Sequence, residues 1–286
     1  LLALAQTTDE KKLAGNYILT QDIDMGPLPA EFPGIGSESA PFTGTFDGNG
    51  KTILNLSIYQ PNEKNVGLFR VIFGGTVKNL TLQNAEVCGK DCVGAVVGWA
   101  KVELSTKSMS GSVAGLIGNV HVTNSFVTGH WQTGGIVGLN GGASDSKTKF
   151  SVANAVDRCS FAGVISGRET TGGIAGQNDG AITLCQTGGR VDAVEQGTMA
   201  GGAAGENNGD IYDSCSKMTV QGRSYIGGFV GSGTGSVERC YSTGDVSGGG
   251  YVGGFAGSIS NVETALSTGT VTADGSDGQG YKGGFA

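Results

Sequence analysis

The hydrophobic residues of this chain fall into short runs that glycine, asparagine, serine or aspartate separate. The longest runs resemble residues 93–100 and are far shorter than the roughly 18 apolar residues that a membrane-spanning helix needs. Many runs are rich in β-branched and aromatic residues, which is typical of β-strands. Helix signals are nearly absent after residue 15. The pattern therefore predicts many short strands, with helix confined to the N-terminus.

One phrase, two glycines or a single glycine among apolar residues, recurs nine times and serves as the anchor of a repeat. Its copies begin at Val66, Val93, Val113, Thr133, Thr171, Ala200, Ile226, Val252 and Lys282. Successive copies begin 20 to 38 residues apart. A self-similar period of this size is typical of solenoids and propellers.

A second phrase lies between the anchors and predicts further strands. It reads Val-Glu-Arg-Cys-Tyr-Ser-Thr-Gly over 237–244 and Val-Glu-Thr-Ala-Leu-Ser-Thr-Gly over 262–269, with similar octets at 122–129 and 156–163. A short apolar stretch then follows, so each repeat holds three strand-like runs. Three strands in about 26 residues fit one coil of a parallel β-helix better than a four-stranded propeller blade.

We therefore expect an all-β fold, a right-handed parallel β-helix of three-strand coils with a short N-terminal capping helix. Each strand would pair with its equivalent in the next coil, so that inward side chains form ladders. The glycine pairs of the anchor phrase would let the backbone turn or approach closely at a corner. A bulky substitution at Gly228 or Gly254 should then destabilise its coil.

Residues 1–65 are expected to form the N-terminal cap and first coils, and residues 66–286 the repeat coils of the same continuous domain. All five prolines lie in the first part. Residues 1–13 combine helix-forming residues with apolar positions on one side, which suits a helix that covers the end of a solenoid. Because the sequence stops inside an anchor phrase, at Phe285-Ala286, we expect the natural chain to continue beyond residue 286.

Three segments carry a family resemblance: residues 16–25, residues 42–53 and the Val-Gly-Leu-Phe of 66–69. They resemble the opening of bacterial β-helix proteins with GLUG repeats, and the later Gly-Gly-Phe-Val-Gly phrases resemble the GLUG motif itself. The likeness covers nearly the whole chain and weakens at 100–112 and 139–155. It implies a large secreted or surface-anchored bacterial protein, such as an adhesin, or a region beside a catalytic domain, as in streptococcal IgA proteases. The motif is structural, so no functional residue is carried over.

Composition narrows the range of partners. Glycine supplies 54 of 286 residues, whereas charged residues are only 15% and the net charge is -7. A nucleic-acid partner is excluded because the basic footprint for phosphates is missing. The same acidity disfavours an anionic membrane surface, and no membrane insertion is expected. The composition is not that of a disordered chain, because 38% of the residues are apolar.

The residues suggest no catalytic site, metal site or cofactor. His121 and His130 are the two histidines, and no Cys/His grouping has the spacing of a zinc site. Asp22, Asp24 and Asp47 either bind Ca²⁺ or act as a carboxylate pair, or they cap turns through their side chains. Turn capping is the favoured interpretation, since the resemblance places these residues in the cap of the fold.

The six cysteines divide into two groups. Cys159, Cys185, Cys215 and Cys240 occupy similar repeat positions, at spacings of 26, 30 and 25 residues. Coils about 4.8 Å apart hold such side chains farther apart than a disulfide requires, so we expect a ladder of buried free thiols. Cys88 and Cys92 flank a short loop and are either a local disulfide or two free thiols.

Aromatic residues are the candidate binding residues. Tyr225, Tyr251 and Tyr281 each stand two residues before a Gly-Gly-Phe and should stack in one row. If the row faces outward, it is suited to stack on sugar rings or to hold a protein partner; if inward, it is core packing. Trp131 and the loop at 140–154 are the second candidate, and a plain surface insertion is the alternative for the loop.

Three functions remain open. The favoured one is a non-catalytic segment of an extracellular or surface-exposed bacterial protein, an adhesin or rigid scaffold that binds a host glycan or matrix protein. The second is a carbohydrate-active β-helix enzyme, a polysaccharide lyase or glycosidase, but lysines and arginines number only 18 and do not recur in register. The third is a substrate-recognition region of a larger secreted protease.

Overall fold

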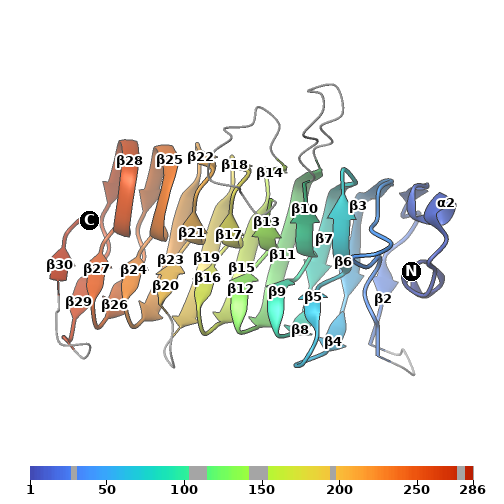
Figure 1. Ribbon diagram of the computed structural model, residues 1–286, viewed down its shortest axis with the longest axis horizontal. Coiled ribbons are helices and arrows are strands. Elements are labelled where there is room, and N and C mark those ends of the chain that lie inside the picture. Colours follow the sequence, from blue (N-terminus) through green and yellow to red (C-terminus); the bar gives the residue numbers. More distant parts are fainter. Residues whose placement is uncertain (27–30, 103–114, 142–153, 194–197, 276–280, 286) are drawn as a thin grey trace.

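The computed structural model describes residues 1–26, 31–102, 115–141, 154–193, 198–275 and 281–285. The chain winds into a stack of coils along one long axis, with the two helices at one end and β30 (Tyr281–Gly283) at the other (Figure 1). Its strands pair in parallel with the equivalent strands of neighbouring coils. The all-β parallel β-helix predicted from the repeats is confirmed.

Two short helices occupy the place of the single helix expected at the N-terminus. They are α1 (Leu2–Ala5) and α2 (Glu10–Leu13). The side chain of Asp9 accepts a hydrogen bond from the Lys11 N–H at 2.9 Å, which starts α2 as a helix of its own, because such a cap satisfies a free N–H at a helix N-terminus. Leu4 and Leu13 are buried and join the core of the coils.

One side of the solenoid is an eight-stranded parallel sheet to which each coil contributes one strand. In spatial order its strands are β5 (Lys64–Val66), β9 (Asp91–Gly94), β12 (Trp131–Gly134), β16 (Thr170–Gly172), β20 (Met199–Gly201), β24 (Tyr225–Gly227), β27 (Tyr251–Gly253) and β30.

The remaining sides form a 22-stranded sheet that wraps around the core. Its strands in the first half of the chain are β1 (Asn16–Ile18), β2 (Ile23–Asp24), β3 (Thr45–Leu54), β4 (Ser57–Tyr59), β6 (Phe69–Phe73), β7 (Thr76–Gln83), β8 (Glu86–Cys88), β10 (Val97–Lys101), β11 (Leu116–Thr128) and β13 (Val137–Asn140). Those in the second half are β14 (Ala155–Asp157), β15 (Ser160–Ser166), β17 (Ala175–Asn178), β18 (Ala181–Thr183), β19 (Gln186–Ala193), β21 (Ala204–Asn207), β22 (Asp210–Tyr212), β23 (Cys215–Gly222), β25 (Val230–Ser242), β26 (Val246–Gly248), β28 (Ala256–Ser267) and β29 (Val271–Ala273).

The anchor phrase forms a corner between the two sheets. In the coil that begins at Thr170 it is divided between β16 and β17, so this coil has four short strands, β16 to β19, instead of the three expected. A Cβ on Gly173 would lie 2.0 Å from the carbonyl oxygen of Gly202 in the next coil. Only a residue without a side chain fits at such a close approach.

The prediction of an anchor copy at residues 113–118 is wrong. Residues 113 and 114 lie outside the described residues, but Leu116, Ile117 and Gly118 open β11 and pair with β7 and β14 in the large sheet. The eight-stranded sheet passes directly from β9 to β12, where Gly94 pairs with Gly134. The segment resembled an anchor in composition alone, whereas strand register assigns it to another face.

Inward side chains form the continuous ladders that were expected of the fold. One ladder joins, at equivalent positions of successive coils, Phe46, Val77, Ile117, Val156, Ile182, Ile211 and Val237. Each of these side chains is at most 2% exposed. Burial of this apolar stack, coil after coil, supplies the main driving force for folding.

Asparagines form hydrogen-bonded ladders at the bends. Asn55, Asn84 and Asn124 each have a positive φ, and their amides are joined at 3.2 Å and 2.7 Å. Asparagine tolerates this left-handed conformation better than most residues with side chains. A second ladder, Asn140–Asn178–Asn207, is fully buried. These ladders fix the corners that orient the outer faces of the coils.

Candidate functional site

The outer face of the eight-stranded sheet carries the predicted tyrosine row. Tyr225, Tyr251 and Tyr281 pair in register on β24, β27 and β30, and we call them the tyrosine ladder. Their ring centroids are 4.9 Å apart at both steps, with interplanar angles of 2° and 13°. Tyr225 is half-buried, whereas Tyr251 and Tyr281 are 38% and 55% exposed. The structure thus turns the row outward.

A phenylalanine ladder lies on the inner side of the same coils. Phe229 and Phe255 are completely buried, and their rings stack at 5.0 Å between centroids. The anchor glycines separate the two ladders in the sequence: Ile226 and Gly227 follow Tyr225, and both are buried. A parity count along the sequence could not assign the direction of the tyrosines, because the corner at the glycines interrupts strand alternation.

The stacking of the tyrosines decides what they present to solvent. Each ring lies face to face with the next, so Tyr251 has its two faces toward Tyr225 and Tyr281. The ladder therefore offers ring edges and a row of hydroxyl groups, rather than free faces on which sugars could stack. Phenol hydroxyls donate and accept hydrogen bonds, so the row suits a ligand with regularly spaced polar groups.

Trp131 lies on the same sheet but is not part of the tyrosine ladder. It is 54% exposed on β12, in register with Asp91 of β9, which in turn pairs with Lys64 of β5. β16 and β20 lie between β12 and β24, so about 14 Å of sheet separates Trp131 from Tyr225, at roughly 4.8 Å per strand. The structure therefore splits the four predicted binding residues into two groups.

Trp131 borders a hollow of about 430 Å³. Its lining consists of Lys64, Lys90, Asp91, Cys92, Trp131 and Gln132, and we call it the Trp131 hollow. Lys64 Nζ lies 3.3 Å from Asp91 Oδ2. The other carboxylate oxygen, Asp91 Oδ1, is buried and has no hydrogen-bond partner among the described residues. The sequence singled out Trp131 as a binding residue and Cys92 only as a disulfide candidate, and it did not single out the other residues of the lining.

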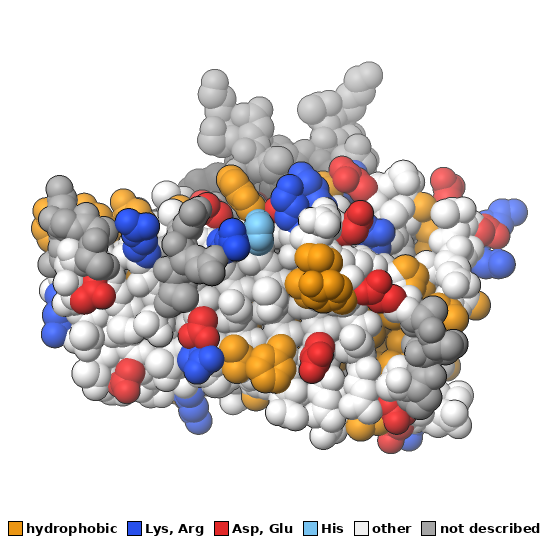
Figure 2. All heavy atoms as spheres, turned by 90° about the horizontal axis from the view of Figure 1, so that it is seen from below, with side chains coloured by type: hydrophobic (Ala, Val, Ile, Leu, Met, Phe, Trp, Pro, Cys, Tyr) orange, Lys and Arg blue, Asp and Glu red, His pale blue; other side chains and the backbone are white. Residues whose placement is uncertain are grey.

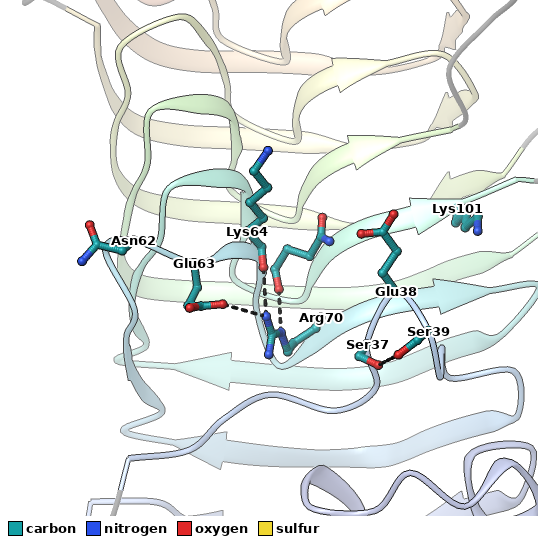
Figure 3. Close-up of a pocket in the computed structure, with 9 residues that line it drawn as sticks. Ser37, Glu38, Ser39, Asn62, Glu63, Lys64, Arg70 and Lys101 are labelled. Carbon is teal, nitrogen blue, oxygen red and sulfur yellow. Dashed lines mark hydrogen bonds and ion pairs between the residues drawn. The ribbon is translucent and has the colours of Figure 1, made fainter.

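A larger cleft of about 700 Å³ lies beside the first coils, and no sequence pattern predicted it (Figure 3). Its residues include Ser37, Glu38, Glu63, Arg70 and Lys101. Figure 3 shows that the Arg70 guanidinium points back toward residues 63–65. It donates to Lys64 O and Asn65 O at 3.2 Å and lies 3.4 Å from Glu63 Oε2. Because these contacts occupy Arg70, the cleft is a weaker candidate for ligand binding.

The surface gives no sign of one continuous apolar interface on the face drawn in Figure 2. Its hydrophobic side chains form separate clusters, and acidic and basic side chains lie near them. Isolated groups of this kind are common on soluble proteins, whereas a large docking interface requires a contiguous patch. The candidate site thus depends on the tyrosine ladder and the Trp131 hollow.

The predicted thiol ladder needs one correction. Cys159, Cys185, Cys215 and Cys240 are all buried and free, and the Cys159 N–H donates to Cys185 Sγ at 3.4 Å. Cys215, however, pairs with Gln186 and Tyr241. Cys215 comes 30 residues after Cys185, which is one residue more than the length of this coil. Ser214 therefore occupies the ladder position between Cys185 and Cys240.

Cys88 and Cys92 are both free thiols in the structure, at the end of β8 and within β9. Burial, together with the adjacent Asp91 carboxylate, raises the pKa of Cys92 to about 12. Burial also raises the pKa of Cys88. Both thiols therefore stay protonated at neutral pH, and Cys92 donates its S–H to Gln132 Oε1 at 3.6 Å.

The acidic residues near the N-terminus hold backbone and amide groups, which confirms turn capping for Asp24 and Asp47, whereas Asp22 holds the backbone of Thr52 in the next coil. Asp22 Oδ1 accepts from the Thr52 N–H and Asp24 Oδ1 from the Gly26 N–H. Asp47 Oδ1 accepts from the Asn49 N–H at 2.8 Å. Hydrogen bonds hold the pKa values of Asp24 and Asp47 below their ordinary value. These carboxylates are therefore occupied by contacts within the chain.

Metal-binding groups and membrane-spanning helices are both absent from the described part of the chain. No three His, Cys, Asp or Glu side chains there form a group that could hold a metal ion. None of the helices in these segments has the length and apolar character to cross a membrane. Most of the loop predicted as a second candidate, residues 142–153, lies outside the described residues.

Comparison with known proteins agrees with this picture of the fold. Residues 222–247 match the family described as the GLUG motif, and this segment includes β24 with Tyr225. A stretch of 119 residues, 39% of the chain, is 38% identical to Halomucin from Haloquadratum walsbyi (strain DSM 16790 / HBSQ001). The match spans only 1% of Halomucin.

A crystal structure of a candidate immunoglobulin A1 protease from Bacteroides ovatus has the same fold. It matches with a TM-score of 0.63 and 20% sequence identity, over 87% of this chain and 77% of that one. At this identity the likeness concerns the fold alone. Together with the matched motif, it identifies the chain as a β-helix repeat protein that carries the GLUG motif.

Proposed function

We propose that this GLUG-motif β-helix is a non-catalytic segment of an extracellular or surface-exposed bacterial protein, an adhesin-like scaffold whose ligand is a polysaccharide. The outer face of the eight-stranded sheet would be the binding face. The observation that carries the proposal is the exposed, in-register tyrosine ladder, because Tyr251 and Tyr281 leave much of their area to solvent instead of packing in the core.

The repeat of the sheet favours a polymeric ligand. Tyrosine hydroxyls recur at the spacing of the coils, with ring centroids 4.9 Å apart. A chain of similar sugar units laid along the solenoid axis would meet a similar hydroxyl environment at each step. Many weak, repeated contacts on a rigid scaffold then add to a useful affinity without a deep pocket.

A non-catalytic role is supported because charged side chains are engaged in hydrogen bonds and ion pairs within the chain. A polysaccharide lyase or glycosidase needs acids and bases that converge on a substrate. Here the carboxylates of Asp22, Asp24 and Asp47 hold backbone N–H groups. Arg239 is paired with Asp213 at 2.6 Å.

The comparisons support the proposed extracellular or surface location and leave a second function open. The name Halomucin is that of a mucin, an extracellular class of protein. The structural neighbour is described as a candidate protease, which favours, as the second function, a substrate-recognition region within a larger secreted protease. A matrix protein is the alternative ligand in both cases.

The test is binding of the purified 286-residue chain to an array of polysaccharides and matrix proteins, whose spots are examined afterwards for cleavage. The proposal expects saturable binding to polysaccharide spots with the polymer left intact. Cleaved spots would overturn the non-catalytic role. Binding confined to matrix proteins would replace the polysaccharide by a protein ligand.

A further inference from the structure

The backbone around Trp131 differs from that of the later coils of the same sheet. Asn65, Cys92 and Gln132 lie in register and have positive φ values of 56°, 52° and 38°. At the equivalent position of the later coils, Tyr225 and Tyr251 do not have this conformation. A left-handed residue interrupts strand alternation, so two successive residues of β9 and of β12 line the outer surface.

This local backbone forms the Trp131 hollow, whose volume of about 430 Å³ lies within the usual range of small-ligand sites. Gln132 is held in place because its backbone N–H donates to Thr170 Oγ1 at 3.1 Å and its Nε2 donates to Gln177 Oε1 at 3.2 Å. The Trp131 N–H lies 3.2 Å from the Lys90 carbonyl oxygen. The hollow is thus a preformed site on a rigid scaffold.

Trp131 supplies the apolar surface of the hollow. It is 54% exposed, and its ring makes no stacked or tilted contact with another aromatic ring among the described residues. This distinguishes it from the tyrosine ladder, in which the rings cover one another's faces. An exposed indole that no other aromatic ring covers, beside polar groups, is suited to the apolar face of a pyranose ring.

Asp91 supplies an acceptor that lacks a donor. Its Oδ2 is engaged by Lys64 Nζ at 3.3 Å, whereas Oδ1 is buried and unpartnered. A buried carboxylate oxygen without a donor is costly, so a rotation of the carboxylate that offers Oδ1 to a ligand hydroxyl would be favourable. The hydroxyls of a sugar are donors of this kind.

The charges of the hollow select the type of sugar. Lys64 and Lys90 line it together with the single carboxylate of Asp91, so its lining carries a net positive charge in a chain of net charge -7. Lys64 is paired with Asp91, whereas the Lys90 ammonium has no ion-pair partner in the described segments. A cationic ligand would meet two ammonium groups, so an anionic ligand is favoured.

We propose that the Trp131 hollow binds one acidic sugar unit, a hexuronate or sialate residue, whose ring lies on Trp131, whose carboxylate pairs with Lys90 and whose hydroxyl donates to Asp91 Oδ1. This inference rests on the proposed function, since it assigns a ligand class to one end of the proposed binding face. It does not need the tyrosine ladder, none of whose residues lines the hollow.

The experiment is a calorimetric titration of the 286-residue chain with methyl β-D-glucuronide, N-acetylneuraminic acid and the neutral methyl β-D-glucoside. At least one acidic probe should bind more than about tenfold more tightly than the glucoside, as expected for a charge-assisted contact. Trp131→Ala should weaken that binding by about tenfold or more. Lys90→Met should remove the preference for acidic probes.

An exposed tyrosine outside the proposed binding face serves as the control. Tyr59→Ala removes an exposed ring on β4 and should not alter the affinity for the acidic probe. Because the chain has two tryptophans, a Trp99→Phe protein reports probe binding through Trp131 fluorescence alone. This readout keeps the proposal testable if Trp131→Ala does not fold.

Three results would overturn the inference: no saturable binding of any acidic probe, equal affinity for the neutral glucoside, or unchanged affinity in both Trp131→Ala and Lys90→Met. If these occur while the chain still binds polysaccharide on the array, only the assignment of the hollow fails. If the chain binds no polysaccharide on the array while the acidic probe still binds through Trp131, the proposed role of the tyrosine ladder fails instead.

Discussion

The ring of Tyr251 lies on that of Tyr225 with 4.9 Å between centroids and an angle of 2° between the planes, on the outside of a sheet whose inner side is a closed core. Two coils thus present aligned aromatic side chains to solvent. Such a row contributes to stability as well as to a surface for a ligand, and the two contributions are separable by mutation.

Tyr251→Ala should lower the free energy of unfolding by about 1 to 3 kcal/mol, because it removes two stacking contacts of about 0.5–1.5 kcal/mol each. Tyr251→Phe keeps the stacking and should change stability by well under 1 kcal/mol. Chemical denaturation of the three proteins measures the difference. Equal destabilisation by Ala and Phe would mean that the hydroxyl, and not the stack, stabilises the coil.

Gly228→Ala should destabilise the fold by about 1 to 3 kcal/mol, the usual cost of forcing extra atoms into a packed site. A Cβ there would lie 2.2 Å from the carbonyl oxygen of Gly254 in the next coil. Gly188→Ala is the matched control, since no atom would lie within 4 Å of the added Cβ, and it should be neutral or slightly stabilising. A similar loss in both proteins, measured by thermal unfolding, would contradict the close-approach explanation.

Asn178→Ala should cost about 2 to 4 kcal/mol, because it leaves two buried amide groups without partners. Asn140 Nδ2 now donates to Asn178 Oδ1 at 2.8 Å, and Asn178 Nδ2 donates to Asn207 Oδ1 at 2.7 Å. The exposed neighbour Asn208 provides the control, and Asn208→Ala should cost less than about 1 kcal/mol. Urea titrations that rank the two variants in the opposite order would show that the buried ladder is dispensable.

The raised pKa of Cys92 predicts a pH dependence of stability. In the folded chain its pKa is about 12, against an ordinary value of 9.0. The neutral thiol is thus favoured in the folded state, so its contribution is fully present below pH 9 and is lost as pH rises from about 9 toward 12. Unfolding free energies should fall over this range, and less steeply in Cys92→Ala.

Thiol labelling provides an independent check of the cysteines. Reaction with a disulfide reagent at pH 8 requires thiolate, so Cys92 should react slowly despite its place in the wall of the hollow. The four buried thiols should react only on unfolding. Rapid labelling of Cys92 in the native protein would show that its thiol is neither buried nor raised in pKa.

Much of the fold follows from the sequence, because glycine pairs and hydrophobic runs recur with the period of one coil. The predictions that failed are those that depend on strand register. The segment at 113–118 and Cys215 matched their repeats in composition, but one inserted residue or one additional connection changes the partner of every residue that follows. Pairing between distant coils, which a single sequence does not display, decides such cases.

The candidate site was predictable only as residue types. The tyrosines and Trp131 were visible in the sequence, but their grouping depends on backbone conformation. The tyrosines alternate with the buried Ile226 and Val252 in their short strands, and the pairing of β12 with β9 places Trp131 beside Asp91. A single sequence displays neither the buried side of such short strands nor their pairing, so the hollow and its unpartnered carboxylate oxygen emerged from the structure alone.

The most direct test of the binding face is the dissociation constant of the polysaccharide selected on the array, for the wild type and for a Tyr225→Ser/Tyr251→Ser/Tyr281→Ser protein. Tyr59→Ser, which removes a ring that is 67% exposed elsewhere, is the control. The account predicts that the triple variant binds at least about tenfold more weakly and that the control binds normally. Unchanged affinity in a folded triple variant would contradict it.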